Sequence, residues 1–204
     1  FGERGSQGAA TFQAPNPPFG AIFTYYLSES LETKLQTRQK AEKKLTQENK
    51  DIPFPGWKEI EKERRQEAPK ILLVVKDELG NIIRTINGEV SKGFHRIAWD
   101  LTYPATNAID PDYLISKYQP KGMLAAPGKY SVTLVKRIDG ELISLSDAYE
   151  FELIKLHKGA LEGDSPENVA AFWREIEDMQ KATSATSVAL KNAINRVNAL
   201  QIAL

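Results

Sequence analysis

Few side chains in this sequence have the type and spacing that catalysis requires. The 204 residues include two histidines, His95 and His157, and no cysteine. Without cysteine the chain can form neither a disulfide, nor a zinc–thiolate site, nor a thiol nucleophile. The sequence also has no HExxH pair, no glycine-rich phosphate loop and no Gly-x-Ser-x-Gly turn. We therefore expect no catalytic residue, no cofactor and no bound metal.

Paired carboxylates are the other route to chemistry, because a glycosidase places two of them around the scissile bond. Asp100, Asp110 and Asp112 are the candidates. Asp100 follows an apolar strand, where a carboxylate commonly accepts hydrogen bonds from backbone amides. Asp110 and Asp112 flank a proline, which is typical of a turn. We interpret these residues as structural, together with His95, on the inward face of a strand, and His157, in a polar loop.

Aromatic rings suggest a second hypothesis, carbohydrate binding, since exposed rings can stack on the faces of sugars. The candidates are Tyr103, Tyr113 and Tyr118, all within residues 102–125, and Trp57. The alternative is that these rings pin a long loop to the body of the protein. A carbohydrate site predicts exposed, coplanar rings, whereas a structural role places them against the protein.

The first half of the chain predicts a helical insertion between strands. Residues 19–27 are aromatic and β-branched, as in a strand. The charged segment that follows predicts a helix over 31–49 capped by Ser30, with a thin apolar stripe that lies on another part of the protein. A second helix is expected over 57–67, stopped by Pro69. These helices form an insertion over 28–69, and their interspersed acidic residues indicate a solvated surface, not a nucleic-acid site.

From Lys70 onward the pattern is that of β-strands: residues 71–75 are a continuous apolar run, and later runs alternate between apolar and polar residues. Asp139-Gly140 indicates a hairpin, and residues 102–125 read as a long loop. Six to eight short strands with helices outside the run predict an immunoglobulin-like antiparallel β-sandwich over 19–160. The expected core residues are Ile71, Leu73, Val75, Ile97, Trp99, Tyr130, Val132, Leu134, Phe151 and Leu153.

The clearest periodic pattern is a long helix over 164–204. Asp164 or Ser165 is expected to cap it, with Pro166 in its first turn. Apolar positions recur at alternating spacings of three and four, which defines a heptad seam. We call this set the seam: Val169, Phe172, Ile176, Met179, Thr183, Thr186, Leu190, Ala193, Val197, Leu200 and Leu204.

At about 1.5 Å per residue the helix would be about 60 Å long, too long to bury the seam on a small sandwich. Its partner is therefore another copy, residues 31–49, or a segment beyond Leu204. Thr183 and Thr186 weaken the centre of the seam, which argues against a very stable isolated dimer.

Composition and charge limit the remaining classes of protein to which the chain can belong. Lys and Arg number 27 and Asp and Glu number 27, so the net charge is zero and indicates no nucleic-acid partner. The sequence has no run of about 18 apolar residues, so it predicts no membrane-spanning helix. The chain begins at Phe1 without a signal-peptide pattern, and residues 1–18 are rich in Gly, Ala and Pro. We expect a fragment of a larger protein that starts with a linker or extended arm.

Two stretches carry a resemblance to known families. Residues 93–100, GFHRIAWD, preceded by NIIRTI at 81–86 and followed by APGKYSVTL at 126–134, resemble the immunoglobulin-like domain of flagellar hook-capping proteins. In that pattern a strand with a Trp-Asp pair leads through a loop to a Pro-Gly turn. The resemblance implies that Trp99 anchors the core.

More of the chain, 14–204, resembles the C-terminal region of large bacterial proteins with sortilin-like or BNR-type β-propeller repeats, which are glycosyl hydrolase-like. The similarity is carried by APNPPFGAIFTYYL at 14–27, the charged insertion, the Trp99 strand and the closing helix. It implies a β-propeller N-terminal to this chain and a secreted or periplasmic location.

These observations predict a non-catalytic structural and interaction module with a coiled-coil helix. One alternative is a carbohydrate-binding accessory domain. Another is that the 102–125 loop completes an active site in the propeller.

Overall fold

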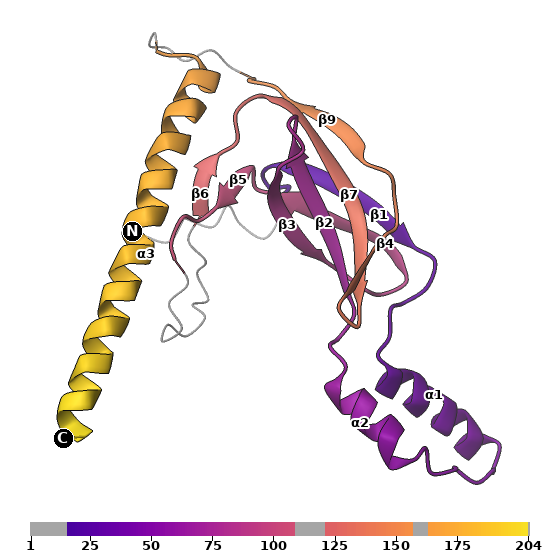
Figure 1. Ribbon diagram of the computed structural model, residues 1–204. Helices are drawn as coiled ribbons and strands as arrows, with labels where there is room; N and C mark the ends of the chain where they lie inside the picture. Colours follow the sequence, from indigo (N-terminus) through magenta and orange to yellow (C-terminus); the bar gives the residue numbers. More distant parts are fainter. Residues whose placement is uncertain (1–15, 109–120, 157–162, 204) are drawn as a thin grey trace, which may run out of the picture.

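The computed structural model describes residues 16–108, 121–156 and 163–203. Within these ranges the protein is mainly antiparallel β-sheet with three helices, one of them long and C-terminal (Figure 1). The elements are β1 (Ala21–Leu27), α1 (Lys34–Gln47), α2 (Trp57–Arg65), β2 (Lys70–Asp77), β3 (Ile82–Gly88), β4 (Gly93–Trp99), β5 (Thr102–Pro104), β6 (Lys121–Leu124), β7 (Gly128–Ile138), β8 (Glu141–Ser144), β9 (Tyr149–Leu153) and α3 (Pro166–Ala203).

The strands form three antiparallel sheets. The largest has the order β3-β2-β7-β8, and β9 also pairs with β7. Strands β1 and β4 form a separate pair in which Phe23 lies opposite Ile97. The β1–β4 pair lies over one face of the large sheet, so the body has two layers (Figure 1).

The core lies between these two layers and follows from the alternation in β2. Ile71, Leu73 and Val75 point to the same side and are all buried, whereas the residues between them are partly exposed. Tyr25 of β1 packs against Ile71 and Leu73, and Trp99 of β4 belongs to the cluster around Val75. All ten expected core residues are buried or packed against these clusters, which confirms the sequence prediction.

Trp99 is the largest side chain at the centre, with 1% of its surface exposed. Its ring meets that of Tyr130 edge-on at a centroid distance of 5.6 Å, and its Nε1 donates a hydrogen bond to the carbonyl of Thr102 at 3.1 Å. Burial raises the pKa of Tyr130 to about 12. The indole therefore joins the two layers and also fixes the chain just after β4.

The N-terminus of α1 differs from the sequence prediction. The cap is Thr33, whose Oγ1 accepts from the amide of Gln36 at 3.1 Å while Gln36 Oε1 accepts from the Thr33 amide. Ser30 instead accepts a hydrogen bond from the amide of Lys92, and the Leu31 amide bonds to Val90. Because these contacts tie Ser30 and Leu31 to the β3–β4 connection, the helix starts later than predicted.

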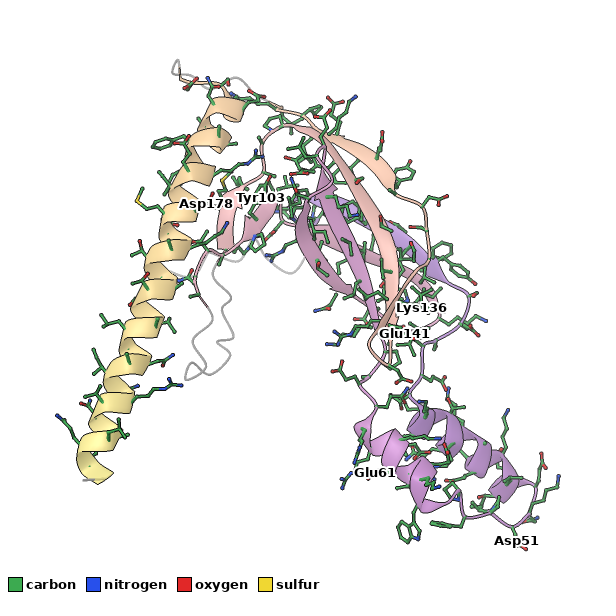
Figure 2. All side chains as sticks on the ribbon, viewed as in Figure 1. Asp51, Glu61, Tyr103, Lys136, Glu141 and Asp178 are labelled. Atoms are coloured by element: carbon green, nitrogen blue, oxygen red, sulfur yellow. The ribbon has the colours of Figure 1, made fainter. Side chains whose placement is uncertain are left out.

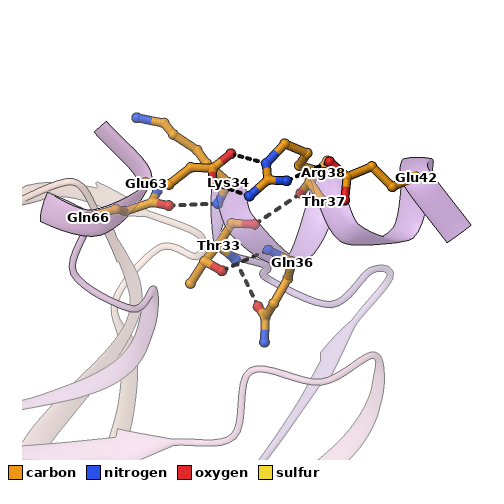
Figure 3. Close-up of polar contacts among 8 residues, drawn as sticks. All are labelled: Thr33, Lys34, Gln36, Thr37, Arg38, Glu42, Glu63 and Gln66. Atoms are coloured by element: carbon orange, nitrogen blue, oxygen red, sulfur yellow. Dashed lines mark hydrogen bonds and ion pairs between the residues drawn. The ribbon is translucent and has the colours of Figure 1, made fainter. Parts of the chain in front are cut away.

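Helices α1 and α2 form a hairpin that is joined by several polar contacts (Figure 3). Arg38 makes two hydrogen bonds to Glu63, at 2.7 and 2.8 Å, and the amide of Lys34 donates to Gln66. Neither helix has a buried residue. The expected apolar stripe therefore does not lie on the sandwich, and α2 ends at Arg65, earlier than predicted.

The segment predicted as a long loop begins and ends in strands. β5 and β6 pair with each other, so Thr102 lies opposite Leu124. Gly122 is required here, because a Cβ would lie 2.3 Å from the carbonyl oxygen of Pro104. The resulting two-stranded ribbon lies between the sandwich and α3 (Figure 1).

Candidate functional site

Helix α3 begins as the sequence predicts and contacts the body along one narrow face. Ser165 Oγ accepts from the amide of Asn168 at 3.2 Å, which caps the first turn. Ala170 is the one described residue of α3 that is fully buried, with 6% exposed. Further along, the side chain of Gln180 bonds to Thr106 at 3.0 Å and that of Ser184 to the amide of Ala108 at 2.9 Å.

Most of the seam lies on the side of α3 opposite Ala170. At about 100° per residue, Phe172, Met179, Leu190 and Val197 lie roughly opposite Ala170. Their side chains are between 54% and 67% exposed, and Leu200 is equally open. Ile176 is half-buried because it lies at the margin between the two faces. The helix therefore faces the body with Ala170, Trp173 and polar residues, and most of the seam is exposed to solvent.

The arrangement of the elements excludes one of the three partners that were expected to cover the seam. The α1–α2 hairpin extends from the end of the sandwich remote from α3 (Figure 1). Segment 31–49 therefore does not cover the seam. Thr183 and Thr186 donate their hydroxyls to the carbonyls of Met179 and Ala182, each at 2.8 Å, so the polar atoms at the centre of the seam are already satisfied within the helix.

The four aromatic candidates do not form one site. Tyr103 is half-buried, packs against the Trp99 cluster and accepts a hydrogen bond from Arg174 of α3, which raises the pKa of Arg174 (Figure 2). Trp57 lies on the distant hairpin, edge-on to Phe54 at 5.2 Å. Tyr113 and Tyr118 lie outside the described residues. Tyr103 thus fits the structural interpretation and links the β5–β6 ribbon to α3.

Of the two histidines and the carboxylates Asp110 and Asp112, the structure describes only His95. His95 is half-buried, lies 5.2 Å from the Tyr25 ring, and its Nε2 is 2.6 Å from the carbonyl oxygen of Ser91. This agrees with a hydrogen-bonded structural histidine. His157, Asp110 and Asp112 lie outside the described residues, so their structural interpretation stays a prediction.

A groove of about 690 Å³ separates the start of α3 from the β6–β7 connection. Met123, Leu124 and Pro127 line one wall, and Val169 and Trp173 line the other. Sequence reasoning missed Trp173 because it falls outside the seam. Its position on the body side of α3 follows only once the docked face is known.

Asp100 is held by the ribbon, as expected for a carboxylate at a strand end. It accepts from the amide and hydroxyl of Thr102, at 3.2 and 2.6 Å, and pairs with Lys121 at 2.7 Å. Burial alone would raise the pKa of Asp100, but the hydrogen bonds from Lys121 and Thr102 outweigh it and lower the pKa to about 2. These contacts fasten β5 and β6 to the end of β4.

Replacing Asp100 with asparagine is expected to destabilise the protein by about 1 kcal/mol at pH 7, a value reduced for the partial exposure of the carboxylate. Because the folded pKa lies below the unfolded one, the stabilisation is present above about pH 4 and is lost as the pH falls towards 2. Urea unfolding of both proteins at several pH values measures the difference. A gap that stays constant down to pH 2 would contradict this assignment.

No family model, curated protein or solved structure matches the chain. Across the described ranges no three His, Asp or Glu side chains gather in a way that could hold a metal ion. Over the same ranges, no helix has the length and apolarity to cross a membrane. The exposed apolar side chains of the seam on α3 form the candidate site that the geometry supports best.

Proposed function

We propose that this chain is a non-catalytic structural and interaction module in which the β-layers hold α3 as an assembly helix. The observation that carries the proposal is the position of the seam, most of which is exposed along the helix and lies roughly opposite the buried Ala170. Apolar side chains at heptad spacing gain stability only when a second helix covers them. The occupant that we propose is the α3 of another copy.

The size of the exposed surface supports a second copy. Helix α3 spans Pro166–Ala203, or about 55 Å at 1.5 Å per residue, and its seam continues through the half that extends beyond the ribbon (Figure 1). Ser184 lies away from the seam, so a second helix would leave its contact with Ala108 in place, whereas Gln180 flanks the seam and would lie beside the partner helix. A pair of this length approaches the surface of about 800 Å² per partner that stable protein interfaces bury.

The charges beside the seam favour an antiparallel pair. Most positions flanking the seam are small or uncharged, and the exceptions are Glu175 and Arg196. They are about equally far from the middle of the helix. An antiparallel alignment therefore places Glu175 of each copy opposite Arg196 of the other, whereas a parallel alignment places Glu175 and Arg196 opposite uncharged glutamines, Gln180 and Gln201.

Sedimentation velocity over a concentration series tests the pairing. We expect a reversible dimer for the wild type, and a dissociation constant at least about 100-fold higher for Leu190→Glu, because pairing would bury an unpaired carboxylate. Asn195→Glu is the matched control, since it adds the same charge on the side of α3 away from the seam and should dimerise normally. A wild type that stays monomeric, or equal effects of both substitutions, would contradict the proposal.

Charge exchange tests the orientation in the same experiment. Glu175→Arg and Arg196→Glu are each expected to weaken the dimer several-fold, because each sets like charges opposite one another. The double variant should recover the wild-type affinity. An antiparallel pair is overturned if the double variant is as weak as the single ones.

The wider setting follows from the resemblance. We propose that the two layers are an immunoglobulin-like sandwich that follows a β-propeller in a larger secreted or periplasmic bacterial protein. The central tryptophan on a strand, meeting Tyr130 across the core, supports this proposal. Pairing through α3 would then join two copies of the larger protein while leaving their N-terminal parts separate.

A further inference from the structure

The α1–α2 hairpin carries a second exposed apolar surface, at its far end. Ile52, Phe54 and Trp57 lie in and beside the connection between the two helices, and they are 50%, 61% and 78% exposed. We call these three residues the tip. The label of Asp51 marks this end of the hairpin in Figure 2, remote from both the sandwich and α3. The tip is thus independent of the proposed assembly surface.

The tip is held in one conformation despite its exposure. Pro53 and Pro55 restrict the backbone on both sides of Phe54. Gly56 has a φ of +89°, which allows the chain to turn into α2, and Phe54 packs edge-on against Trp57. Aromatic rings that are fixed before binding lose little entropy on binding.

The hairpin is also fastened to the sandwich. Lys34 pairs with Asp139 in the β7–β8 turn at 2.8 Å, and Arg137 of β7 pairs with Glu67 at 2.5 Å. The Arg38–Glu63 contact joins the two helices, and together with the Arg38–Glu42 bond it raises the pKa of Arg38. These bonds hold the tip at a constant distance from the body.

Lysines surround the tip without matching acids. Lys43 and Lys44, in the last turns of α1, and Lys58, beside Trp57, make no ion pair with any residue that the structure describes. Glu48 is paired with Lys50 at 2.7 Å, which leaves Asp51 as the acid of the connection. The zero net charge of the chain therefore conceals a locally basic end.

We propose that the tip binds the surface of an anionic phospholipid bilayer. Tryptophan and phenylalanine favour the boundary between headgroups and acyl chains, and lysines near that boundary each gain about 1 kcal/mol from anionic lipid. Three side chains on a convex end are far fewer than the 20–30 residues a stable protein interface uses on each side. A bilayer needs no such complementary surface, so few inserted side chains together with basic charge are sufficient.

Co-sedimentation of the full chain with vesicles tests this proposal. The probe is phosphatidylcholine containing about one third phosphatidylglycerol, compared with phosphatidylcholine alone. We expect binding to the anionic vesicles and a blue shift of tryptophan emission that is lost in Trp57→Phe, because Trp57 is 78% exposed, Trp173 on α3 is 43% exposed and Trp99 is buried. Replacing Phe54 and Trp57 with alanine should weaken binding at least about tenfold, as should Lys43→Glu with Lys44→Glu and Lys58→Glu.

Matched variants identify the surface that binds. Tyr26 and Phe94 form another exposed aromatic pair, with ring centroids 4.8 Å apart on the outer face of β1–β4, and their replacement with alanine should leave binding unchanged. Circular dichroism confirms that each variant is folded. The proposal is overturned if wild type does not bind, or if the Tyr26 and Phe94 variant loses binding as strongly as the tip variant.

Discussion

Replacing Trp99 with alanine is expected to lower the free energy of unfolding by about 3–5 kcal/mol, because it removes the largest side chain from a core with little room to collapse. The indole is 1% exposed and meets the rings of both Tyr130 and Phe151. Its loss also leaves the Thr102 carbonyl without its donor. Small domains are stable by about 5–15 kcal/mol, so the variant should lose a large part of its stability.

Urea unfolding followed by far-UV circular dichroism measures this loss. Trp57→Ala is the matched control, since the same side chain is removed from a site that is 78% exposed, and a change within about 0.5 kcal/mol is expected. Equal losses in the two variants would show that Trp99 is not the centre of the core. The comparison also establishes that variants of the tip report on binding and not on folding.

Gly20→Ala is expected to destabilise the protein by about 3 kcal/mol through the backbone rather than the core. Gly20 precedes β1 with a φ of +117°, a conformation that other residues rarely adopt. A Cβ at this position would lie 1.8 Å from the carbonyl oxygen of Trp99. Because that obstacle is backbone at the end of β4, relief requires the β1–β4 pair to move apart.

A second glycine separates the strain of a positive φ from the collision with the Trp99 carbonyl. Gly80 also has a positive φ, +84°, but a Cβ there would meet no atom within 4 Å. Gly80→Ala should therefore cost only the conformational strain, about 1 kcal/mol. Thermal unfolding of both variants gives the difference, which measures the collision with Trp99. If the two variants unfold alike, close packing of Gly20 on β4 is not important for stability.

The sequence was most informative where one periodicity continued over many residues. Alternation in β4 and β7 identified Ile97, Trp99 and Tyr130 as core, and the three-four spacing after Pro166 identified the long helix. Both patterns report which side of an element is apolar. They do not report what covers that side, and so the sequence left the partner of the seam undecided.

Predictions failed where tertiary contacts competed with local ones. Ser30 is a good capping residue, but its hydroxyl bonds to Lys92, which is distant in sequence, so Thr33 caps α1. The β5–β6 ribbon was missed because its strands are short. The docked face of α3 could not be found from hydropathy, since Ala170, Gln180 and Ser184 resemble an ordinary solvent-facing stripe.

The place of the α1–α2 hairpin in the chain has a consequence for folding and for evolution. It is inserted between β1 and β2, while β1 must wait to pair with β4 across the whole segment. The entropy lost on closing a loop grows only logarithmically, by about 0.6 kcal/mol for each doubling of its length. The sandwich therefore pays almost nothing for the length of the insertion. A lineage could lengthen, shorten or exchange the hairpin, and so alter what the protein touches at that end, without redesigning the core.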